Sequence, residues 1–170
     1  MMRIASKLLV ALAISTMPTI AMAQWSTTVE DDIFTGGKKA TLVVPVSDYD
    51  SSNALVFDCT KNDLYFAYVE KSNEPEKVSN LPVDIIVKVD SGEVIKLKAA
   101  FSQRNDRYVQ AASGDREEII KILSDASRAK SKVIVGISSD TIGKYSVTVN
   151  ANGSSKAVSK FTGACEINKK

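Results

Sequence analysis

An alternating pattern of apolar and charged residues between positions 83 and 101 constrains the fold of this chain most strongly. Apolar side chains occupy every second position in two runs, 83–89 and 95–101, and a Ser91-Gly92 turn separates the runs. Aspartate and lysine fill most positions between them, with Ile86 as an apolar exception on the polar face. A period of two with charge on one side predicts a half-solvated antiparallel pair of strands.

Similar short runs elsewhere extend the sheet. They cover residues 25–31, 41–46, 54–59, 63–70, 107–111, 133–137 and 145–149, and turn residues separate them. At Asp115 the apolar spacing becomes helical, with Asp115 as N-cap and Glu118 three residues later, which predicts a helix over 115–128. A second helix is predicted over 155–168, with Val158, Phe161 and Cys165 on one face. We therefore expect an α+β fold, with a mostly antiparallel sheet or sandwich of eight or nine strands and two helices.

The first 23 residues have the pattern of a secretory signal peptide. Arg3 and Lys7 precede an apolar stretch over 8–14, and Pro18 interrupts the segment. The residues at 21–23 are Ala-Met-Ala, which predicts cleavage between Ala23 and Gln24. We expect an exported, periplasmic chain of one domain over 24–170, with no membrane span after cleavage.

Charge and histidine content exclude several classes of function. The sequence has 22 basic and 20 acidic residues, and loss of Arg3 and Lys7 with the leader leaves the two balanced at 20 each. This balance gives no indication of nucleic acid or an anionic membrane surface as partner. The chain has no histidine, which excludes Ser-His-Asp and Cys-His catalysis and removes the usual zinc ligands. It also has no phosphate-binding or dinucleotide motif, so we expect neither a cofactor nor a metal.

The two cysteines, Cys59 and Cys165, are expected to form one structural disulfide. A single pair in an oxidising compartment has one intramolecular solution. Cys59 lies at the end of a predicted strand and Cys165 on the apolar face of the second predicted helix. The bond would therefore tie the C-terminal helix to the sheet.

Polar loops supply the remaining candidate sites. Glu30, Asp31 and Asp32 form a carboxylate cluster, which we interpret as a solvated loop because it lacks the spacing of a calcium loop. Two longer loops, over 47–53 and 72–81, are predicted to contact a protein partner. Their candidate contact residues are Tyr49, Asp50, Asn73 and Glu74.

Several landmarks occur in order along the chain. Trp25 follows the leader at once, the sequence Leu-Val-Phe-Asp-Cys ends at Cys59, and residues 153–158 lead through Phe161 to Cys165. In these landmarks the chain resembles the TagO-like group of small exported proteins associated with type VI secretion. It departs from that pattern in having no tryptophan after the second cysteine. The resemblance implies a periplasmic, non-catalytic accessory protein.

Together these features favour a non-catalytic module that binds a protein partner in the cell envelope. It would be an accessory to a secretion system or an inhibitor of an exported enzyme. One alternative is a histidine-free hydrolase, which requires two nearby carboxylates, one with a raised pKa. Another is a carrier of a small apolar ligand, which requires a sizeable closed cavity.

Overall fold

Nine strands form one antiparallel sheet in the order β1-β2-β3-β4-β7-β6-β5-β8-β9. The computed structural model describes residues 25–46 and 52–167. The strands are β1 (Ser26–Asp32), β2 (Gly37–Pro45), β3 (Asn53–Cys59), β4 (Leu64–Lys71), β5 (Leu81–Val89), β6 (Val94–Asn105), β7 (Tyr108–Ser113), β8 (Lys132–Ser139) and β9 (Gly143–Asn150). The helices are α1 (Arg116–Arg128), α2 (Ser154–Ala164) and a short 3₁₀ turn, η1 (Pro75–Lys77).

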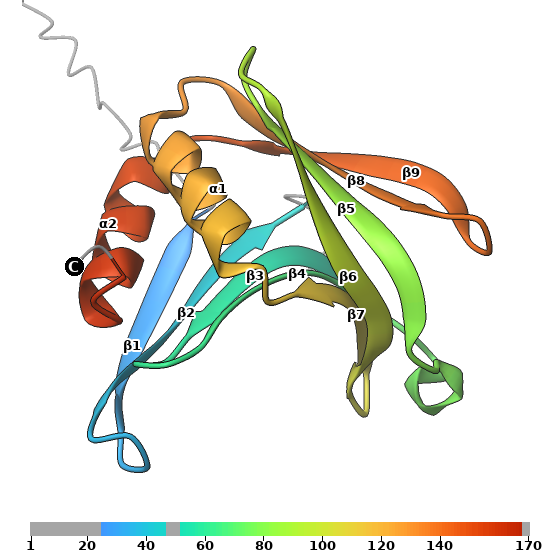
Figure 1. The fold of residues 1–170 in the computed structure, drawn as a ribbon, viewed down its shortest axis with the longest axis horizontal. Coiled ribbons are helices and arrows are strands. Elements are labelled where there is room, and N and C mark those ends of the chain that lie inside the picture. The colour runs from blue at the N-terminus through green and yellow to red at the C-terminus, as the bar shows by residue number, and fades with distance from the viewer. Residues whose placement is uncertain (1–24, 47–51, 168–170) are drawn as a thin grey trace, which may run out of the picture.

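The sheet curls into a half-barrel, and α1 and α2 lie on its concave side (Figure 1). Helix α2 packs on β1 and β2, whereas α1 reaches β4, β5 and β6. The two edge strands, β1 and β9, approach each other at one end only. There the indole Nε1 of Trp25, just before β1, donates to the carbonyl of Asn150 at 2.7 Å. This hydrogen bond joins the two ends of an otherwise open sheet.

The hydrophobic core fills the space between the concave face and the two helices. Its largest fully buried side chains come from six strands and both helices. They are Tyr68, Phe57, Phe66, Phe161, Leu42, Leu55, Ile85, Leu97, Ile119, Ile122, Leu123 and Ile137. Since sheet and helices share one core, neither layer buries its apolar face without the other.

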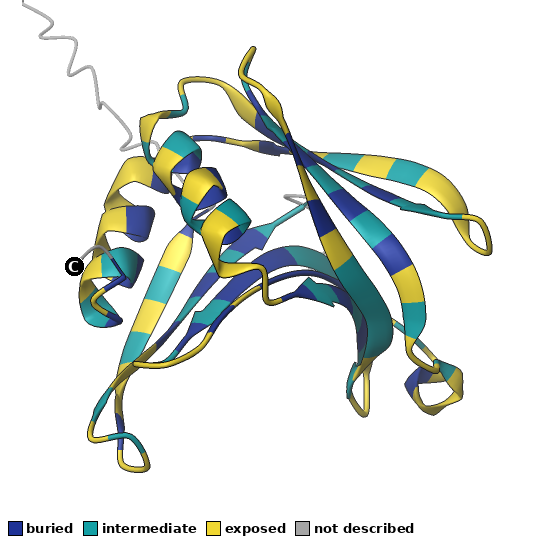
Figure 2. Ribbon diagram, in the orientation of Figure 1, coloured by how far each residue is buried: buried dark blue, intermediate teal, exposed yellow. Residues whose placement is uncertain are grey.

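Alternating burial along the strands explains why the period-two pattern predicts the sheet. In β5 the odd-numbered residues from Val83 to Val89 are buried and their neighbours are partly exposed, as the bands of Figure 2 show. Strand β6 is buried at Ile95 and Leu97 and exposed at Lys96 and Lys98. The predicted α+β fold with a mostly antiparallel sheet and two helices is confirmed.

Helix α1 begins as predicted. The Asp115 side chain accepts a hydrogen bond from the Glu118 N–H at 3.3 Å, which caps one of the free N–H groups of the first turn. Ile119, Ile122, Leu123 and Ala126 form its buried face.

Helix α2 is shorter than the predicted 155–168. It ends at Ala164, and Asn168 lies outside the described residues. Glu166 adopts a left-handed conformation with φ of 54°, and the Ile167 N–H donates to the Thr162 carbonyl at 3.1 Å. This is the hydrogen bond of a Schellman motif, which terminates a helix. Because glutamate occupies the left-handed position where glycine is usual, the sequence carries no signal for this helix end.

The predicted disulfide between Cys59 and Cys165 is present. It joins the end of β3 to the residue that follows α2, across a sequence separation of 106 residues. Both cysteines are buried. The bond therefore fixes α2 to the sheet at the end opposite its N-terminus.

Candidate interaction surface

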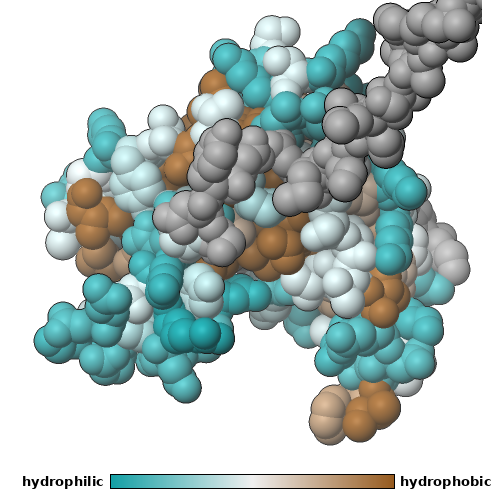
Figure 3. Space-filling view, turned by 180° about the vertical axis from the view of Figure 1, so that it is seen from behind, coloured by the Kyte–Doolittle hydropathy of each residue, from teal (hydrophilic) through white to brown (hydrophobic). Residues whose placement is uncertain are grey.

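The turn between β1 and β2 carries the two most exposed large apolar side chains of the described residues. Ile33 is 84% exposed and Phe34 is 92% exposed. In Figure 3, which views the molecule from behind, the β1–β2 turn ends in a hydrophobic projection at the lower right. We call Ile33 and Phe34 the hairpin tip. Two adjacent large apolar side chains on a projecting turn make this turn a candidate site for contact with another molecule.

Hydrogen bonds within the turn hold the hairpin tip in one conformation. Asp32 is only 7% exposed, and its carboxylate accepts from the Phe34 N–H at 3.0 Å and the Thr35 hydroxyl at 2.5 Å. These two hydrogen bonds, from Thr35 first and then Phe34, lower the pKa of Asp32. The Gly36 N–H closes the turn on the Asp32 carbonyl at 2.9 Å, and Gly36 has the positive φ of 69° that this closure needs.

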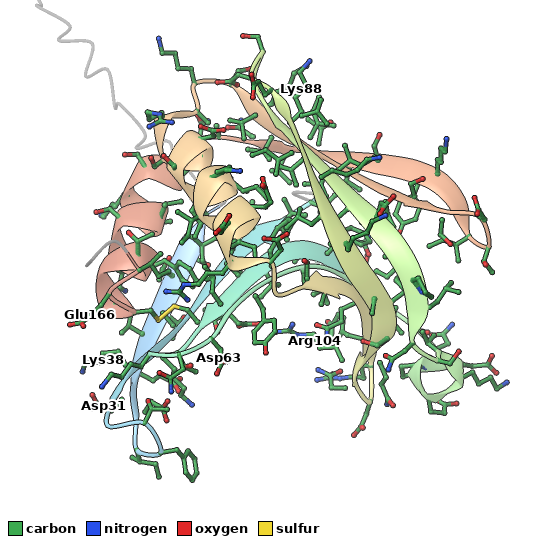
Figure 4. The ribbon with its side chains drawn as sticks, viewed as in Figure 1. Asp31, Lys38, Asp63, Lys88, Arg104 and Glu166 are labelled. Atoms are coloured by element: carbon green, nitrogen blue, oxygen red, sulfur yellow. A yellow bond between two sulfur atoms is a disulfide. The ribbon has the colours of Figure 1, made fainter. Side chains whose placement is uncertain are left out.

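The strands below the hairpin tip carry paired charges. Lys38 pairs with Asp31 and Lys39 with Glu30, and Figure 4 shows Asp31 and Lys38 beside each other at the base of the turn. The hydrogen bond from Lys38 lowers the pKa of Asp31. Each carboxylate of the Glu30–Asp32 cluster therefore already has a lysine or a turn hydrogen bond as partner. The projection is apolar at its end, and both lysines along its sides are paired with carboxylates.

The predicted contact residues lie elsewhere or outside the description. Asn73 and Glu74 are exposed between β4 and η1, and Glu74 pairs with Lys77 at 2.6 Å. In Figure 1, η1 and the β1–β2 turn lie at opposite sides of the sheet, so the structure does not bring these residues to the hairpin tip. Tyr49 and Asp50, and the predicted cleavage residues Ala23 and Gln24, lie outside the described residues.

The sequence contains a weak signal for the hairpin tip. Two large apolar residues stand between Asp32 and the Gly36-Gly37 turn, where polar residues are usual. An apolar pair in a turn is compatible with burial under a neighbouring element as well as with exposure. The structure shows exposure, because no element among the described residues covers Ile33 and Phe34.

A second pair of carboxylates tests the hydrolase alternative. Asp84 and Asp140 line a surface hollow of about 270 Å³ with Lys98, Ser138 and Ser139. The Lys98 ammonium donates to Asp84 at 2.7 Å, and this hydrogen bond lowers the pKa of Asp84. A general acid needs a raised pKa, so Asp84 has the wrong environment for that role.

Two further features concern the helices and the interior. A groove of about 370 Å³ runs between α1 and α2, and hydroxyls of Ser124, Ser127, Ser155, Ser159 and Thr162 line much of it.

On the concave side of the sheet, Tyr68 and Tyr145 make an edge-to-face contact at 5.8 Å between ring centroids. Burial raises the pKa of both phenols, so both stay neutral at physiological pH.

Within residues 25–46 and 52–167, no helix is long and apolar enough to cross a membrane. The same residues contain no group of three or more cysteine, aspartate or glutamate side chains arranged to hold a metal ion. No protein-family model, curated protein or solved structure matches the chain.

Proposed function

We propose that this chain is a non-catalytic protein-binding module of the cell envelope, either an accessory to a secretion system or an inhibitor of an exported enzyme. The observation that supports this function is the hairpin tip, where Ile33 and Phe34 project from a turn that hydrogen bonds hold in place. A partner with an apolar pocket would receive both side chains.

The energetics favour the hairpin tip as an anchor. Full burial of an isoleucine or phenylalanine side chain contributes roughly 1.5–3 kcal/mol each relative to exposure. The turn is already ordered by Asp32, so binding loses little backbone entropy. Apolar anchors of this kind, in the centre of a contact, contribute most of the affinity of many interfaces.

The charges around the hairpin tip favour a protein pocket over an anionic bilayer. The ion pairs of Lys38 with Asp31 and of Lys39 with Glu30 leave no excess of positive charge on the flanking strands. Insertion into an anionic membrane depends on such an excess in addition to apolar residues. An apolar pocket needs only complementary shape and an uncharged centre.

The TagO-like resemblance supports the accessory function as a proposal. Its landmarks all have structural roles here, since Trp25 joins the sheet edges and Cys59 and Cys165 form the disulfide. These landmarks stabilise the fold, whereas the hairpin tip is the exposed surface that a partner would contact. The proposal combines an exported, disulfide-bonded scaffold with an exposed apolar anchor.

Site-specific photo-crosslinking in cells tests this function. A photoreactive phenylalanine analogue replaces Phe34, and a matched probe replaces Tyr65, which is 50% exposed in β4. We expect a discrete crosslinked protein from position 34 only. Adding Ile33→Ser to the crosslinking chain should reduce its yield at least about tenfold, the effect of losing 1.4 kcal/mol of binding. Equal crosslinking from both positions, or no crosslink at position 34, would contradict the proposal.

A further inference from the structure

The outer face of β6, β5, β8 and β9 concentrates positive charge. Pairing along these strands places five lysines on this one side of the sheet, while the residues between them face the core. The five are Lys88, Lys96, Lys98, Lys132 and Lys144. We call this surface the lysine face. Figure 4 shows Lys88 on it, far from Asp31 and Lys38 below the hairpin tip.

On its strands the lysine face carries five lysines and one carboxylate among the described residues. Asp84 is its one carboxylate among the described residues, and it pairs with Lys98. The other four lysines form no ion pair with any described residue. Asp90, Glu93 and Asp140 lie at its rim, in the turns that connect the strands, and the Asp90 carboxylate accepts a hydrogen bond from the Lys132 N–H. On β1 and β2, Lys39 pairs with Glu30, and at the C-terminal end of β6 Arg104 pairs with Asp58 of β3.

The centre of the lysine face is apolar. Ile86 pairs in register with Lys96 on one side and Gly136 on the other, and Ile134 pairs with Lys88. Both isoleucines are partly exposed, and Gly136 adds no side chain between them and β9. Ile86 is the apolar exception in the alternating sequence pattern, and its position here accounts for it. Lysines thus surround a small apolar centre on a broad sheet surface.

We infer that the lysine face is a docking surface for the anionic phospholipid headgroups of a membrane. Charge complementarity carries the inference, because long lysine side chains reach phosphates while their stems and the isoleucines contact the apolar boundary. The composition favours lipid over an acidic protein, since protein interfaces are depleted in lysine and enriched in aromatic residues, and the lysines of this face surround isoleucines with no aromatic side chain among them. The inference goes beyond the proposed protein binding and does not depend on it.

Vesicle co-sedimentation tests this inference directly. The exported, oxidised chain is mixed with vesicles of phosphatidylglycerol and phosphatidylethanolamine, and with vesicles of phosphatidylcholine alone. We expect binding to the anionic vesicles only, weakening steeply as salt is raised because exposed charges are screened. The variant Lys96→Gln/Lys132→Gln/Lys144→Gln should bind about 100-fold more weakly, since each lysine near an anionic surface contributes about fivefold. The matching three arginine substitutions should retain binding.

A second triple variant separates the lysine face from net charge. Lys61→Gln/Lys71→Gln/Lys156→Gln removes the same charge from exposed positions outside the lysine face and should bind within about threefold of the unchanged chain. Equal loss in both triple variants, or absence of binding to anionic vesicles, would overturn the inference. So would binding of the lysine face to soluble polyglutamate with none to vesicles, which would indicate an acidic protein. These outcomes leave the crosslinking test of the hairpin tip unaffected.

Discussion

At the scale of single residues, Asp90 holds the connection between α1 and β8. Its carboxylate accepts hydrogen bonds from the N–H groups of Lys130 at 2.8 Å, Ser131 at 3.1 Å and Lys132 at 2.8 Å. Asp90 has a positive φ of 47°, which is unfavourable for a residue with a side chain. The three hydrogen bonds, from the Lys130 and Lys132 N–H groups first, lower the pKa of Asp90. The charged form therefore binds these N–H groups better than the neutral acid does.

This lowered pKa predicts how stability depends on pH. The folded state favours ionised Asp90. Its contribution to the free energy of unfolding is therefore complete above the ordinary pKa of 3.8, and it is lost as the pH falls through the lowered pKa of the folded state. We expect Asp90→Asn to lower the melting temperature at pH 7, because an amide presents one acceptor oxygen instead of two. The difference from the unchanged chain should shrink as the pH falls from 5 towards 2. Melting curves followed by circular dichroism across this range measure it.

The control for Asp90 is Asp106→Asn, in the exposed turn between β6 and β7. Its melting curve should follow that of the unchanged chain at every pH. A constant difference between Asp90→Asn and the unchanged chain down to pH 2 would assign the effect to backbone strain instead of charge.

At the scale of elements, the sequence predicts what depends on local periodicity. Strand β5 alternates as its sequence does, and α1 begins at the predicted cap. Strand β2 begins at Gly37, four residues before the predicted start at Thr41, because Lys38 and Lys39 are recruited by pairing with Asp31 and Glu30 of β1. Such recruitment depends on a partner strand and leaves no local pattern. The ends of elements are therefore less predictable than their centres.

Helix α2 provides the element-scale prediction. Phe161 is fully buried, and its ring meets Phe57 of β3 edge to face at 6.2 Å between centroids. Phe161→Ala should lower the free energy of unfolding by about 3–5 kcal/mol, because it removes a large side chain from a packed core. Urea unfolding measured by circular dichroism gives this value. Lys156→Ala, on the exposed side of α2, should change it by less than about 0.5 kcal/mol.

The comparison between these two variants is decisive for α2. If Phe161→Ala and Lys156→Ala had equal stability, α2 would contribute little to the core, and the disulfide alone would hold it against the sheet. A large loss confined to Phe161→Ala would show that α2 is part of the cooperative unit.

At the scale of the whole molecule, the placement of charged and apolar side chains on the surface matters, whereas the sequence gives only their numbers. Basic and acidic residues balance over 24–170, yet Lys96 and Lys132 come to lie on one face through pairing of β6, β5 and β8. The exposure of Phe34 has the same origin, since it depends on what the rest of the chain leaves uncovered. Both candidate surfaces follow from the arrangement of strands in space. Neither was predictable from residue order, whereas the cysteine pair was, because two cysteines allow one partner each.

The disulfide provides the prediction at this scale. It closes a separation of 106 residues, from β3 to the end of α2, and so restricts most of the unfolded chain. In the chain-entropy model, a loop of this length contributes about 4–5 kcal/mol to stability. We expect Cys59→Ala/Cys165→Ala to lose about this amount in urea unfolding while keeping its far-ultraviolet circular dichroism spectrum, since the core of the sheet and both helices remains in place.

Reduction of the unchanged chain separates the effect of the bond from the effect of the side chains. The reduced chain and the double alanine variant should unfold at similar urea concentrations, and a reductant should leave the variant unaffected. Unfolding of the variant at the midpoint of the oxidised chain would assign stability to the apolar core alone. Complete loss of structure in the variant would show instead that the core between the sheet and α2 forms only when the bond joins Cys59 to Cys165, because helix docking would then depend on the covalent link.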